Sequence, residues 1–142
     1  DENLHMVFYR NLVSSAFDLA PDATMRAVAD EVINFEMPGA NMAGFRKKST
    51  IIAKAGIYDL RLHHDEVIQP ILMHWKVFER EDLGGEGQQA RDELAAFLTG
   101  LDAQAAKFVD MRAASRDRQA ARGTPSITVD DPHPAALVPQ PI

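Results

Sequence analysis

The sequence contains no cysteine among its 142 residues. This absence excludes disulfide bonds, metal sites built from thiolates and catalysis by a cysteine nucleophile. It is compatible with a reducing compartment, and we expect a cytoplasmic location.

An excess of positive charge is lacking as well. The formal net charge is −6 at pH 7, so nucleic acid is not the expected partner. No apolar run approaches the ~18 to 20 residues that a membrane-spanning helix needs, and we expect no membrane span.

Glycine and proline are scarce before residue 120, whereas alanine, leucine, glutamine and arginine are plentiful. This composition favours an all-α fold. The apolar spacing and the turn residues predict helices at 1–19, 23–35, 44–55 and 59–77, a fifth that follows the segment GGEGQQ and ends near 98, and a sixth at 102–121. Asp22 is the expected N-cap of the second helix, and Pro70 should kink or split the fourth.

The amino-acid composition of the chain changes after residue 121. Five of the eight prolines fall in residues 122–142, which have no helical period. We therefore expect a helical domain at 1–121 and an extended tail at 122–142, with one short strand at Ser126–Val129.

The first residues contain a carboxylate and an imidazole three positions apart, Glu2 and His5. On a helix this spacing places both side chains on one face. Helix bundles that bind two iron ions take such a pair from each of two helices, and single glutamates from two others complete the site. Tyr9 and Leu12 share the stripe, which predicts that it faces inward, where a glutamate needs a partner such as a metal ion.

A solvated surface pair is the alternative interpretation of Glu2 and His5. The chain has no second Glu-x-x-His motif, and two side chains cannot hold a two-metal centre. A second candidate, His63 and His64, is expected to be a solvated helix start, because adjacent helical side chains point about 100° apart and do not converge.

Six short motifs together resemble the C-terminal half of the soluble acyl-acyl carrier protein desaturases. Their order and spacing match that family from residue 1 to about residue 115. The motifs are DENLH followed by Tyr9, DLAPDAT at 18–24, MPG at 37–39, AGIY at 55–58, WKV at 75–77 and LGGEGQQARD at 83–92.

The resemblance implies a ferritin-like di-iron helix bundle that acts as a homodimer. It implies the O2-dependent insertion of a cis double bond into an acyl chain carried on acyl carrier protein, in fatty acid biosynthesis. The cofactor would be two iron ions, and electrons would come from a ferredoxin-type donor. High-valent iron–oxygen chemistry suits this reaction because no side chain can abstract hydrogen from an unactivated methylene.

The resemblance also implies roles for individual residues. Glu2 and His5 would be iron ligands, and Asp1 would hydrogen-bond a ligating histidine on another helix. Met37 and Pro38 would line the substrate channel. The remaining ligands would lie upstream, so we expect the chain to be part of a longer protein and to be inactive alone.

Two other functions stay open at this point. One is a different ferritin-like di-iron oxidase, and the other is a metal-free helical interaction module in which Glu2 and His5 are incidental. Iron content separates the module from the two oxidases, and product analysis separates the oxidases from each other.

Overall fold

The computed structural model describes residues 2–121 and Gly123, and all regular structure in this part of the chain is helical. The all-α prediction is confirmed. In chain order the elements are α1 (Glu2–Leu19), α2 (Pro21–Ile33), α3 (Phe45–Ala55), α4 (Leu60–Leu62), the π-helical segment η1 (His63–Ile68), α5 (Gln69–His74), the 3-10 segment η2 (Val77–Glu79) and α6 (Gly85–Ala121). The predicted strand at Ser126–Val129 lies outside the described residues. The same holds for the predicted tail, except for Gly123.

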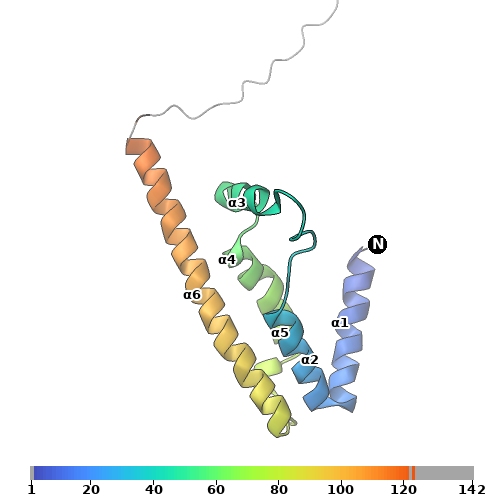
Figure 1. The fold of residues 1–142 in the computed structure, drawn as a ribbon. Coiled ribbons are helices and arrows are strands. Elements are labelled where there is room, and N and C mark those ends of the chain that lie inside the picture. Colours follow the sequence, from blue (N-terminus) through green and yellow to red (C-terminus); the bar gives the residue numbers. More distant parts are fainter. Residues whose placement is uncertain (1, 122, 124–142) are drawn as a thin grey trace, which may run out of the picture.

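The long helix α6 forms one side of the structure, and α1 lies at the opposite side (Figure 1). Between them, α2 packs against both α6 and α1, and α4 packs against α6. The helix α2 therefore lies between α6 and α1, the helix that carries Glu2 and His5, and contacts both.

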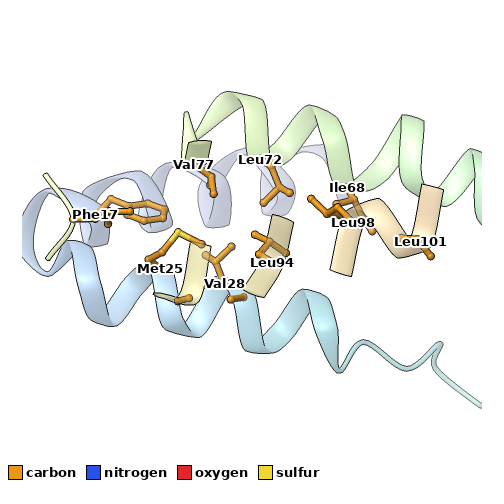
Figure 2. Packing of buried hydrophobic residues seen from close by; sticks show 12 residues of the cluster. Phe17, Met25, Val28, Ile68, Leu72, Val77, Leu94, Leu98 and Leu101 are labelled. Carbon is orange, nitrogen blue, oxygen red and sulfur yellow. The ribbon is translucent and has the colours of Figure 1, made fainter. Parts of the chain in front are cut away.

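The two predicted C-terminal helices are a single helix, so the break expected between residues 98 and 102 is wrong. Gly100 lies inside α6, where an added Cβ would meet open space. Leu94, Leu98 and Leu101 continue one buried stripe through this point (Figure 2). Their burial outweighs the roughly 1 kcal/mol that a helical glycine costs relative to alanine.

The second helix begins at Pro21, two residues before its predicted start, because proline is tolerated in the first turn of a helix. The expected N-cap role of Asp22 is wrong, since the residue lies inside the first turn. Its carboxylate instead accepts a hydrogen bond from the backbone N–H of Gly84 at 2.6 Å. Asp22 thus joins the start of α2 to the start of α6.

The third helix agrees with its prediction. Gly44 precedes it, and Gly56 ends it with φ 75°, a left-handed conformation that suits glycine at a helix C-terminus. This helix carries no buried residue, and it lies beside the loop that contains Met37 and Pro38.

The predicted fourth helix is divided into α4, η1, α5 and η2. Asp59 caps its start by accepting a hydrogen bond from the N–H of Leu62 at 3.0 Å. The division expected near Pro70 is confirmed: the hydrogen-bond pattern is π-helical up to Ile68, and Pro70 stands in the first turn of α5. Proline donates no hydrogen bond, so the change of pattern occurs where it removes a donor.

The largest fully buried side chains come from five different elements and meet in one cluster (Figure 2). They are Phe17, Met25, Leu72, Val77 and Leu94.

The prediction that the stripe of α1 with Tyr9 and Leu12 faces inward is wrong for the described chain. Phe17 is the buried residue of this helix, whereas Met6, Tyr9 and Leu12 are each at least half exposed. The apolar stripe is present, but α2 covers the helix mainly near its C-terminal end.

Candidate metal centre and adjoining cavities

The Glu2–His5 pair lies in the first turns of α1 with both side chains on one face. The Glu2 Oε2 atom is 3.6 Å from His5 Nδ1. The Glu2 side chain is 98% exposed and that of His5 is 66% exposed, so the expectation that they face inward is wrong for the described chain.

The donor atoms of this pair are of types that iron binds, but the pair alone does not form a complete metal site. A carboxylate oxygen and an imidazole nitrogen are both ligands that iron accepts, and here they lie close enough to serve one metal ion. Among the described residues, no group of three or more histidine, cysteine, aspartate or glutamate side chains could hold a metal ion. Glu2 and His5 therefore fit as two ligands of a larger site that other residues must complete. Asp1 lies outside the described residues.

The helix that carries this pair is anchored in its second half. Phe17 is fully buried, and its ring centroid is 6.4 Å from that of Trp75. The indole N–H of Trp75 donates to the backbone carbonyl of Arg10 at 3.0 Å. Trp75 thus packs against the core, and these contacts fix the direction of α1.

Met37 and Pro38 lie in the wall of a cavity of about 430 Å³. Phe45, Lys48 and Ile52 of α3 contribute to the same cavity. Met37 also lines a second cavity of about 400 Å³. The loop between α2 and α3 thus borders two hollow spaces, although α1 lines neither, and the described residues do not bring Glu2 or His5 into contact with them.

The second cavity contains a polar pair that the sequence reasoning missed. The Tyr58 hydroxyl and His63 Nδ1 are 2.7 Å apart, and the His63 ring stacks on Phe35 with 5.2 Å between centroids. Burial lowers the pKa of His63, and the neighbouring His64 lowers it further. Burial also raises the pKa of the Tyr58 hydroxyl, so both groups are uncharged at neutral pH. The only signal for this pair in the sequence was the adjacency of two histidines.

The prediction that His63 and His64 form a solvated helix start is wrong. His64 is buried; its Nδ1 lies 2.6 Å from Asp65 Oδ1, and its Nε2 lies 3.1 Å from the Gln69 amide. The two rings do point to different partners, as adjacent helical residues should. Their burial comes from the π-helical segment, whose i to i+5 spacing brings Gln69 next to His64.

None of the described helices is long and apolar enough to cross a membrane.

Comparison with known proteins agrees with the resemblance seen in the motifs. Residues 1–125 match the fatty acid desaturase family. The chain is 45% identical over 123 residues to the protein of Mycobacterium tuberculosis named acyl-(acyl-carrier-protein) desaturase DesA1, covering 87% of this chain and 36% of the relative. It is 30% identical over 132 residues to stearoyl-(acyl-carrier-protein) 9-desaturase 5, chloroplastic, of Arabidopsis thaliana, covering 88% of this chain and 32% of the relative.

The chain spans about a third of the length of these curated relatives. No solved structure matches it. The family match covers both Glu2 and His5 and the cavity-lining loop, and it confirms the ferritin-like helical fold class expected from the motifs. The chain belongs to the fatty acid desaturase family.

Proposed function

We propose that the protein containing this chain is an acyl-acyl carrier protein desaturase of fatty acid biosynthesis. The observation that carries the proposal is the 45% identity, over 87% of this chain, to a relative named for that activity. The all-helical structure and the exposed Glu2–His5 pair support it.

In the proposed reaction, two adjacent methylene groups of the acyl chain lose one hydrogen each and become a cis double bond. Dioxygen is reduced to two molecules of water, with two electrons from the C–H bonds and two from an external donor. Two iron ions, when bound, supply the dioxygen activation that no protein side chain provides.

The residues of this chain have binding and positioning roles in that reaction. Glu2 would offer a carboxylate oxygen to iron and His5 an imidazole nitrogen, both from the first turns of α1. The proposal keeps Asp1, outside the described residues, as the hydrogen-bond partner of a ligating histidine on another helix. Met37 and Pro38 would line the acyl channel, supported by their place in a cavity wall.

The remaining iron ligands would come from the part of the protein that precedes Asp1. We further propose acyl carrier protein as the carrier of the substrate, a ferredoxin-type electron donor, a homodimer and a cytoplasmic location. The isolated chain should be inactive, because two ligands cannot hold a two-metal centre.

Product analysis with the full-length protein tests this proposal. The purified protein is incubated with saturated acyl-acyl carrier protein, a reduced ferredoxin and dioxygen, and the released fatty acids are examined by mass spectrometry. A monounsaturated product that disappears without dioxygen is the expected result. Iron binding without any unsaturated product would instead support another ferritin-like di-iron oxidase, and a protein that binds no iron would support the metal-free helical interaction module.

A further inference from the structure

The cavity of about 400 Å³ next to His63 is mostly apolar, and residues of five elements line it: α2, α3, α4, η1 and α6. Because α6 is one continuous helix, Phe97, Leu101 and Phe108 all face this space from the same element. Val32 and Phe35 close it at the end of α2 and in the turn that follows. A volume of this size lies in the range of small-molecule sites, which combine an apolar lining with a few fixed polar groups.

The polar groups of the cavity are held in place by hydrogen bonds. The hydroxyls of Ser49 and Thr50, which also line it, both donate to the backbone carbonyl of Arg46. The Asp59 carboxylate is occupied, since it accepts hydrogen bonds from the Leu62 N–H and from Arg112 Nη1 at 2.8 Å. His63 is held by the hydrogen bond to Tyr58 and by its stack on Phe35. The ring of His63 is thus fixed in orientation at the cavity wall.

The hydrogen bond to Tyr58 determines what His63 offers to a ligand. A protonated phenol is a better donor than acceptor, so Tyr58 donates its hydroxyl hydrogen to Nδ1, and the imidazole proton resides on Nε2. Among the described residues no hydrogen-bond partner is found for His63 Nε2. The cavity therefore has one oriented N–H donor in a hydrophobic wall.

The π-helical segment explains why this donor is here. A π-turn inside a helix is uncommon, and such turns occur frequently at functional sites. In this chain η1 begins at His63, with the neighbouring His64 tied to Asp65 and Gln69 and so directed away from the cavity that His63 lines.

We propose that this cavity binds an uncharged chain molecule that carries one hydrogen-bond-accepting oxygen, with His63 Nε2–H as the group that recognises the oxygen. A plain hydrocarbon would leave the N–H without a partner, and a charged group would be buried without a counter-ion. The proposal does not rest on desaturase activity, because it concerns binding by residues of the described chain and needs neither iron nor turnover.

Two probes of nearly equal shape test the proposal with the full-length protein. Decan-2-one carries a carbonyl oxygen where 2-methyldec-1-ene carries a methylene group. Their affinities are compared by calorimetry, and the wild-type protein should bind the ketone roughly tenfold more tightly, the discrimination expected for one buried donor.

Three variants assign the preference to the Tyr58–His63 pair. His63→Phe keeps an aromatic ring but removes the N–H, so it should bind both probes equally and should bind the hydrocarbon more tightly than the wild-type protein does. Tyr58→Phe removes the group that fixes the proton on Nε2 and should reduce the preference. The control His74→Phe changes an exposed histidine outside the cavity and should keep the preference.

A wild-type protein that binds neither probe, or both equally, would overturn the proposal, as would a ketone preference that survives in His63→Phe. Thermal unfolding shows whether that variant is folded. If it is not, the nitrogen resonances of His63 in the wild-type protein decide: the ketone must shift the Nε2 signal and the hydrocarbon must not, and identical spectra would reject the proposal.

Discussion

Trp75 donates its indole N–H to the backbone carbonyl of Arg10 at 3.0 Å and thereby joins the end of α5 to the middle of α1. The two residues are 65 positions apart in the chain. Since Glu2 and His5 lie on the same helix as Arg10, this bond is part of what directs the Glu2–His5 pair.

Replacement of Trp75 by phenylalanine should weaken this connection. The variant keeps a ring against Phe17 but removes the indole donor, while the Arg10 carbonyl still accepts from Ser14 Oγ, so the free energy of unfolding should fall by roughly 0.5 to 1.5 kcal/mol. Urea denaturation of the full-length protein measures the change. The exposed neighbour Met73, changed to leucine, is the control and should have no measurable effect; equal stability of the two variants would mean that the bond contributes nothing.

Two glycines of α6 should respond oppositely to alanine. Gly100 has open space around an added Cβ, so Gly100→Ala should stabilise the protein by about 0.5 to 1 kcal/mol. At Gly87 the added Cβ would clash with the Asp22 carboxylate and approach the Asp22 Cα to 3.2 Å, so Gly87→Ala should destabilise it by roughly 1 to 2 kcal/mol. Thermal unfolding of both variants is the measurement, and shifts of the same sign would contradict the packing of α2 against the start of α6.

Removal of Arg112 should leave the Asp59 carboxylate without its counter-ion. The Asp59 side chain is only 5% exposed, and Arg112 Nη1 lies 2.8 Å from its Oδ2. We expect Arg112→Met to cost roughly 2 kcal/mol, less than for a fully buried pair because Arg112 keeps some contact with water. Arg116→Met, an exposed arginine on the same helix, should change the unfolding free energy by much less; a similar loss in both variants would mean that the ion pair is not the cause.

Because of His63, the free energy of unfolding should fall as the pH is lowered. Folding lowers the pKa of His63 below its ordinary 6.5, so the unfolded chain takes up a proton more readily than the folded one. The stabilisation is fully present above pH ~6.5 and is lost as the pH falls through the folded-state pKa. His63→Phe should therefore flatten the decline of the unfolding free energy between about pH 7 and pH 5, whereas His74→Phe should not. An unchanged slope in His63→Phe would show that another group causes the decline.

The sequence predicted those features of the fold that have local causes. The bounds of α3 follow from Gly44 and Gly56, because glycine readily adopts the left-handed backbone conformation found at both ends of this helix. The pairing of Glu2 with His5 follows from helical spacing alone. Motifs spread over most of the chain identified the family, which no single residue could have done.

The features that were missed depend on contacts between distant residues. Gly100 looks like a helix break until the buried stripe from Leu94 to Leu101 is seen to continue through it. The burial of His63 and His64 depends on a π-turn and on Phe35, neither of which has a local sequence signature. Likewise, periodicity identified the apolar stripe of α1 but carried no information about which neighbour covers it.

Iron content of the full-length protein tests the central claim, that Glu2 and His5 are ligands of a di-iron centre. The wild-type protein should bind two iron ions per polypeptide, and Glu2→Ala and His5→Ala should each bind clearly less while His74→Ala retains both. A wild-type protein without iron, or Glu2→Ala and His5→Ala variants that keep the full complement, would contradict the account.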